Sequence, residues 1–121
     1  MSSPIPQPTQ KSAESLMYIR ADQALHEITE LCKKTLSDLN DKNYPTDWYS
    51  IHKDFIQKAT KIFVDTSFQI NDSLQRPLIV RFRETRHAVD ASVNEKLDHW
   101  SHEQEEMHKS STITIWGCYH K

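Results

Sequence analysis

Apolar residues recur at alternating spacings of three and four along residues 15–39, with polar residues between them. This spacing is typical of one face of an α-helix and of the heptad pattern of coiled coils. Met17, Ala24 and Leu31 broaden the face on one side, so it is wider than a two-stranded coiled coil needs. We therefore predict a helix over residues 12–40 that packs on two sides. Its main face is formed by Tyr18, Ala21, Leu25, Ile28, Cys32 and Leu39, interrupted by Thr35.

A second helical pattern follows Pro45, which disfavours helix at Tyr44 and so predicts a break between the two helices. Thr46 or Asp47 supplies the expected cap. We place the end of this helix within residues 71–77, where Pro77 interrupts the pattern and Asn71 offers a fresh cap. Its apolar face is formed by Ile51, Phe55, Ala59, Ile62, Phe63, Thr66, Ile70 and Leu74.

The third pattern, over residues 78–109, is sparser and becomes polar around the whole helix after Phe82. Such a helix buries few large side chains per turn, so we predict a projecting arm that becomes ordered only on another chain. Arg86 falls within the apolar face, where we expect it to meet a carboxylate of a partner. The face consists of Ile79, Phe82, Val89, Val93, Trp100 and Met107.

The two ends of the chain differ in composition from this helical region. Residues 1–11 contain Pro4, Pro6 and Pro8 among polar residues, which favours a disordered arm. Residues 110–121 alternate β-branched and polar side chains, which predicts a flexible tail or a strand that adds to a partner. The predicted fold is all-α and coiled-coil-like: a long antiparallel hairpin plus a third helical arm, within a helical assembly domain of residues 12–109.

Composition excludes several functional classes. The 121 residues include one glycine, so there is no glycine-rich loop of the kind that holds nucleotides. The net charge of −2 argues against direct binding of nucleic acid. The two cysteines have no metal-type spacing, which suits a reducing compartment, and no apolar run is long enough to span a membrane. We therefore expect a soluble intracellular protein.

Two groups of residues have the spacing of metal ligands. Glu84 with His87, and Glu105 with His108, repeat the Glu-x-x-His unit of di-iron helical bundles. The two units lie 21 residues apart, about 32 Å along one helix, so they cannot share a metal cluster unless the arm folds back or dimerises. A solvated helix face explains them better, and we predict no metal and no cofactor. The second group is His99, His102, Glu103 and Glu106.

Nucleophilic catalysis would require Cys32, which lies on the apolar face and is better explained as a small buried side chain. The sequence therefore offers no catalytic residue, and we expect no enzymatic activity. The one basic cluster suits either phosphate or, given the acidic balance of the chain, an acidic partner helix. It consists of Arg76, Arg81, Arg83, Arg86 and His87, with Phe82 among them.

Half of the chain resembles the metazoan Mediator complex subunit 30 family. The resemblance rests on Ser15-Leu16-x-x-Ile19, a helix ending at Leu39-Asn40, a loop containing Pro45 and a second helix from Trp48, after a proline-rich arm. It fades after Pro77. The resemblance implies a non-enzymatic helical subunit of the nuclear Mediator coactivator, docked on other subunits and without catalytic residues.

The predicted function is therefore that of a structural subunit that adds helices to a shared bundle, with other protein subunits as partners and with self-association when it is isolated. The alternatives are a coiled-coil subunit of a cytoplasmic tethering or trafficking complex, and an enzyme built on a helical metal bundle. The residues expected to contact partners are Leu25, Ile28, Leu31, Leu36, Phe55, Phe63, Ile70, Phe82 and Val89.

Overall fold

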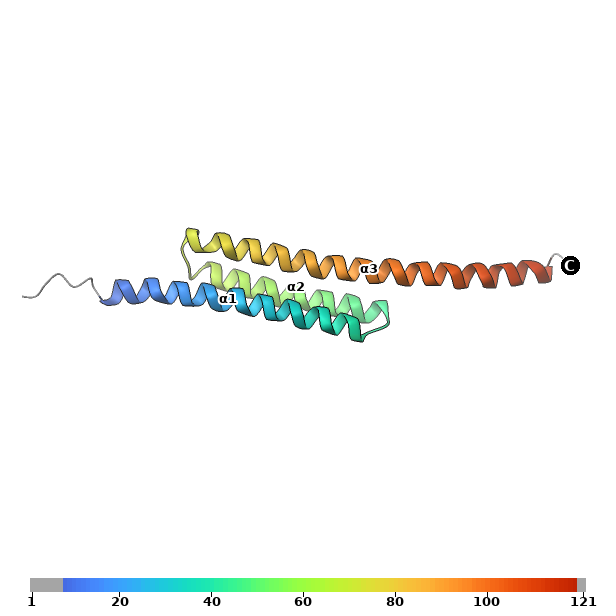
Figure 1. Cartoon of the computed structure of the whole chain (residues 1–121), viewed down its shortest axis with the longest axis horizontal. Coiled ribbons are helices and arrows are strands. Elements are labelled where there is room, and N and C mark those ends of the chain that lie inside the picture. Colours follow the sequence, from blue (N-terminus) through green and yellow to red (C-terminus); the bar gives the residue numbers. More distant parts are fainter. Residues whose placement is uncertain (1–7, 120–121) are drawn as a thin grey trace, which may run out of the picture.

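Three helices make up the part of the chain that the computed structural model describes, namely the backbone of residues 8–119 and the side chains of residues 13–108. They are α1 (Pro8–Asp41), α2 (Pro45–Ser67) and α3 (Asp72–Tyr119). Figure 1 shows α1 and α2 antiparallel, with α3 returning alongside them. Each helix contacts the other two, and residues 8–119 contain no strand. The all-α fold is therefore confirmed. No helix in this part of the chain is long and apolar enough to cross a membrane.

α1 begins earlier than the sequence pattern predicts. The helix starts at Pro8 rather than Ser12, so residues 8–11 of the predicted disordered arm are helical. Proline is well tolerated in the first helical turn, because its missing N–H has no partner there and its fixed φ suits the helix. The remainder of that arm, residues 1–7, lies outside the described residues.

The α1–α2 connection forms at the predicted place but without the predicted cap. Tyr44 has extended backbone, with φ −122° and ψ 140°, and precedes Pro45 in the first turn of α2. No side chain caps this end; instead the carbonyl of Tyr44 accepts bonds from the N–H groups of Asp47 and Trp48. The steric effect of Pro45 on the preceding residue therefore sets the boundary.

The α2–α3 connection confirms a fresh helix start near Asn71. The Oδ1 atom of Asn71 accepts a bond of 3.1 Å from the N–H of Leu74, as an N-cap does. α2 ends earlier than expected, at Ser67, so Ile70 lies in the connection and Leu74 in the first turns of α3. Pro77 lies inside α3 without ending it.

Two clusters of buried side chains join the three helices. One surrounds Phe55 and Val89, toward the α1–α2 connection, and the other surrounds Ile28 and Leu78, toward the α2–α3 connection. Complete burial of a large aliphatic or aromatic side chain stabilises a fold by about 1.5–3 kcal/mol. The clusters are Cys32, Leu39, Trp48, Phe55, Ala59, Val89 and Val93, and Ala21, Ala24, Ile28, Ile70 and Leu78.

The predicted face of α1 is inside the bundle for most of its length. Ala21, Ile28, Cys32 and Leu39 are buried, whereas Tyr18, near the start of the face, is exposed. Thr35 is also buried, and its hydroxyl donates a 2.7 Å bond to the carbonyl of Leu31. This bond removes the penalty of burying a polar group, so the interruption of the face does not break the packing.

The expectation that residues 78–109 form an arm needing another chain is wrong for the first part of α3. Leu78, Val89 and Val93 are buried against α1 and α2, and Trp100 is still partly covered. The spacing of three and four continues through Thr85 rather than Arg86, which therefore points to the surface. Only from residue 101 to residue 108 is every side chain exposed.

The C-terminal end of the chain also has a different secondary structure from the one predicted. α3 runs as one helix to Tyr119, so the backbone over residues 110–119 is helical rather than a strand or a tail separate from the helix. Alternating β-branched residues favour a strand only where another strand is available to pair with. The side chains after residue 108 lie outside the described residues.

Candidate protein interface

The residues that the sequence marks as partner contacts lie mostly within the bundle. Ile28, Phe55, Ile70 and Val89 are buried in the two core clusters. The other five are partly buried and pack against those clusters: Leu25, Leu31, Leu36, Phe63 and Phe82. Phe63 and Phe82, for example, stack with their ring centroids 5.0 Å apart. The apolar pattern is therefore explained largely by packing within this chain.

A different set of apolar residues is uncovered near the start of α1. Residues 16–19 are all apolar, and successive residues of a helix point about 100° apart, so they face four directions. Met17 alone packs against the core, while Leu16, Tyr18 and Ile19 are exposed. Figure 1 shows that α1 begins beyond the α2–α3 connection, which leaves this turn without neighbours on most sides.

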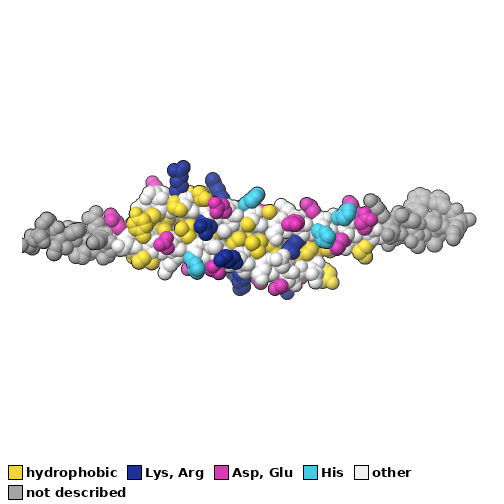
Figure 2. Space-filling model, in the orientation of Figure 1, with side chains coloured by type: hydrophobic (Ala, Val, Ile, Leu, Met, Phe, Trp, Pro, Cys, Tyr) yellow, Lys and Arg dark blue, Asp and Glu magenta, His cyan; other side chains and the backbone are white. Residues whose placement is uncertain are grey.

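The α2–α3 connection exposes further apolar side chains at the same end of the bundle. Phe68 in the connection is 86% exposed, and Val64 and Val80 point outward from α2 and α3. Figure 2 shows apolar side chains gathered at this end, next to the residues drawn in grey. We call this set the apolar end; it comprises Leu16, Tyr18, Ile19, Val64, Phe68 and Val80.

Trp48 stabilises the opposite end of the bundle, although the apolar face predicted from the sequence does not include it. Its ring is buried, and its Nε1–H donates a 2.9 Å bond to the carbonyl of Lys42 in the α1–α2 connection. The Lys96 ammonium of α3 lies 5.9 Å from the ring centroid, within range of a cation–π contact. Extending the apolar face back from Phe55 by seven residues would have found it.

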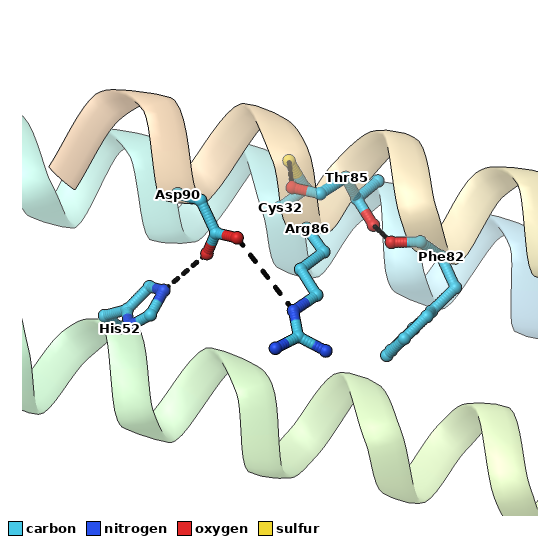
Figure 3. Close-up of polar contacts among 6 residues, drawn as sticks. All are labelled: Cys32, His52, Phe82, Thr85, Arg86 and Asp90. Carbon is cyan, nitrogen blue, oxygen red and sulfur yellow. Dashed lines mark hydrogen bonds and ion pairs between the residues drawn. The ribbon is translucent and has the colours of Figure 1, made fainter. Parts of the chain in front are cut away.

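A polar contact links α2 to α3 beside this core (Figure 3). The Nε2 atom of His52 lies 2.5 Å from Oδ1 of Asp90, and the Nε atom of Arg86 lies 3.9 Å from Oδ2 of the same carboxylate. Arg86 therefore has a carboxylate close by within its own helix, four residues away. All three side chains are partly exposed, so the contact contributes little to stability.

Cys32 behaves as a buried core residue. Its Sγ donates a weak bond to the carbonyl of Thr85 at 3.8 Å (Figure 3). Burial away from water raises the pKa of the Cys32 thiol, so at neutral pH it remains protonated and is a poor nucleophile. This environment supports the packing role that the sequence predicts.

The residues that have the spacing of metal ligands lie on exposed helix surface. Glu84, His87, Glu105 and His108 are all exposed. His99 and Glu103 form an exposed contact of 3.1 Å along one helix face. Across the described residues, no three His, Cys, Asp or Glu side chains come together in a way that would hold a metal ion.

The residues of the basic cluster at the start of α3 differ in what they contact. Arg81 points toward α1, where its Nη1 donates a 2.7 Å bond to the hydroxyl of Thr29. Arg76, Arg83 and His87 are exposed. The cluster is therefore not a single binding patch, because one of its members ties two helices together.

One end of the bundle exposes apolar side chains of the kind found in protein interfaces. Among the described side chains, six of the nine exposed large apolar ones belong to the apolar end, and the other three are Tyr44, Tyr49 and Met107. No family model, curated protein or solved structure matches the sequence. The candidate interface therefore rests on the physical properties of this chain alone.

Proposed function

We propose that this chain is a non-enzymatic structural subunit of a multi-protein assembly, and that the assembly is the nuclear Mediator coactivator. The observation that carries the proposal is the apolar end, whose six large apolar side chains are left in water by the chain's own helices. The choice of Mediator rests on the resemblance of residues 15–48 to the subunit 30 family.

The grouping of exposed apolar side chains at one end of the bundle supports a binding role. Single exposed apolar side chains are normal, but a concentration of them at one place marks an interaction surface. Phe68 and Ile19 are large, and burying either against a partner would contribute about 1.5–3 kcal/mol before the entropy of ordering is subtracted. A partner helix laid across the start of α1 and the α2–α3 connection would remove both from water.

The shape of the chain supports the addition of helices to a shared bundle. α1 extends beyond α2 at one end of the bundle, and α3 extends beyond both α1 and α2 at the other end (Figure 1). A helix without neighbours gains little stability in water, since most helical stability in proteins comes from packing. Both extensions therefore suit contacts with further helices.

Affinity purification of the tagged chain, followed by mass spectrometry, tests the proposal. The wild type should recover Mediator subunits from nuclear extract. A double variant, Ile19→Asp with Phe68→Asp, should lose them, because each carboxylate would be desolvated without a partner at the interface. Circular dichroism of the purified variant should remain helical, since both positions are exposed.

A matched control separates charge from loss of apolar surface. Gln23→Asp with Gln69→Asp adds the same charge at exposed positions on the same two segments and should retain the partners. Recovery of tethering-complex subunits instead would reject Mediator. Retention of all partners by the apolar-end variant would reject the interface.

A further inference from the structure

One stripe of α3, next to its buried face, is rich in arginine. Its residues recur at spacings of three and four, so they lie on one side of the helix. The last of them, Asp90, contacts His52 of α2, so this side of α3 borders α2. Figure 3 shows Phe82, Arg86 and Asp90 extending from α3 toward α2. The stripe consists of Arg76, Ile79, Arg83, Arg86 and Asp90.

Apolar side chains of both helices lie along the seam between α2 and α3. Phe63 of α2 stacks on Phe82 of α3, with the ring centroids 5.0 Å apart. Ile79 comes three residues before Phe82, and Ile56 comes seven residues before Phe63, so each isoleucine shares the side of its helix that carries the ring. All four side chains are only partly buried. The seam therefore presents apolar surface beside the arginines.

The charge along the stripe is positive. Arg76 and Arg83 are exposed and form no ion pair among the described side chains. Asp90 is the one carboxylate of the stripe, and both of its oxygens are already in contact, one with α2 and the other with Arg86. Asp72 lies one turn before Arg76, in the first turn of the helix. Between these two carboxylates the stripe offers three arginines to a partner.

Beyond the first turn of α2, its acidic residues lie on the opposite side, toward α1. Asp54 lines the space between α1 and α2 and pairs with Lys58. Asp65 comes seven residues after Lys58 and so shares its side of the helix. Four carboxylates and three lysines line that α1–α2 side, which is therefore not basic. The two sides of α2 thus differ in charge, and the side that borders α3 adds no carboxylate to the seam.

We propose that this surface binds an acidic amphipathic helix of another protein. Apolar side chains of such a helix would cover the partly exposed seam, and carboxylates along its edge would meet the arginines. Arg76 and Arg83 lie seven residues apart, about 10.5 Å along α3, so carboxylates two turns apart on a partner helix would reach both. We call this surface the basic face; it comprises Ile56, Phe63, Arg76, Ile79, Arg83 and Arg86.

Arginine also binds phosphate, but the composition of the basic face favours a protein partner. Three arginines provide few phosphate contacts, and the net charge of −2 opposes a polyanion. Phe63 and Phe82 stack on one another, so these ring faces are not free to stack on bases. A phosphate backbone would also leave the isoleucines in water. A helix that carries both carboxylates and apolar side chains satisfies both parts of the face.

Binding of synthetic peptides to the full-length chain, measured by titration calorimetry, tests the proposal. The probe is a peptide of about 20 residues, long enough to form a helix, with leucines along one side and glutamates along both flanks. A scrambled peptide of the same composition keeps the charge and loses the pattern. The wild type should bind the patterned peptide at least about tenfold more tightly, because only that peptide presents apolar side chains and carboxylates together.

Charge reversal locates the binding site. Arg76→Glu with Arg83→Glu should lower the affinity for the peptide at least about tenfold, because like charges then meet. The control Lys34→Glu with Lys61→Glu makes the same change in net charge on the α1–α2 side and should bind as the wild type does. All four positions are exposed, so circular dichroism of both variants should remain helical. A peptide with lysine in place of glutamate should bind the arginine variant more tightly than it binds the wild type.

The apolar-end variant separates this proposal from the proposed function. Ile19→Asp with Phe68→Asp leaves the basic face unchanged, so it should bind the peptide as the wild type does even where it loses Mediator subunits. Loss of peptide binding by this variant would place the peptide at the apolar end and overturn the basic face. Equal affinity for the two peptides, normal binding by the arginine variant, or an equal loss in the lysine control would also overturn it. So would tighter binding of a DNA duplex or of anionic vesicles than of the acidic peptide.

Discussion

The sulfur of Cys32 on α1 lies 3.8 Å from the carbonyl oxygen of Thr85 on α3, two residues separated by 53 positions in the sequence. Three residues earlier on α1, the hydroxyl of Thr29 accepts a bond from Arg81 of α3. The two contacts advance together along both helices, so α3 runs parallel to α1. They place the first part of α3 firmly on its own hairpin.

Raising the pH should destabilise the fold through Cys32. Burial raises the pKa of this thiol in the folded state, so the stability it confers is fully present below the ordinary thiol pKa of about 8.5. That stability is lost as pH rises through the raised folded value, because the unfolded chain ionises first. Chemical denaturation across this range should show a steeper loss for the wild type than for Cys32→Ala. Parallel curves for the two proteins would contradict the assignment.

Two valines on α3 offer a matched test of its packing. Val89 is 0% exposed and Val80 is 48% exposed. Val89→Ala should lower the free energy of unfolding by about 2 kcal/mol, through lost burial and a residual cavity. Val80→Ala should change it by less than about 0.5 kcal/mol. Urea denaturation measures both, and equal effects would mean that α3 does not pack on the hairpin as described.

Replacement of Trp48 by phenylalanine separates its hydrogen bond from most of its apolar burial. Trp48→Phe removes the bond to the Lys42 carbonyl and should cost about 1 kcal/mol. Trp48→Ala also removes the buried ring and should cost about 3–5 kcal/mol. Thermal unfolding followed by circular dichroism compares the two variants. If Trp48→Phe is as damaging as Trp48→Ala, then the hydrogen bond rather than burial dominates.

Hydrogen exchange should divide α3 into two regions. In dilute protein, amides around Val89 and Val93 should be strongly protected, because their side chains are buried between helices. Amides of residues 101–108 should exchange quickly, since no other element covers them. Uniform protection of α3 in dilute protein would contradict the division.

The sequence by itself determined the number of helices and most of their inward faces. Spacings of three and four selected Ile28, Cys32 and Leu39 on α1 and Phe55 and Ala59 on α2, all of which are buried. Pro45 marked the first break through a local steric rule. Such features depend on neighbours within a few residues, so the pattern along the chain is sufficient to predict them.

Only the tertiary structure decided whether α3 packs on its own hairpin and which apolar residues remain uncovered. Thr85 takes the inward position that the sequence pattern assigned to Arg86. Its hydroxyl tolerates burial there because it donates a bond to the Arg81 carbonyl within the helix. Leu16, near the start of α1, and Phe68, directly after α2, are apolar yet exposed. Burial depends on which elements meet in space, and the spacing of residues along one helix does not contain that information.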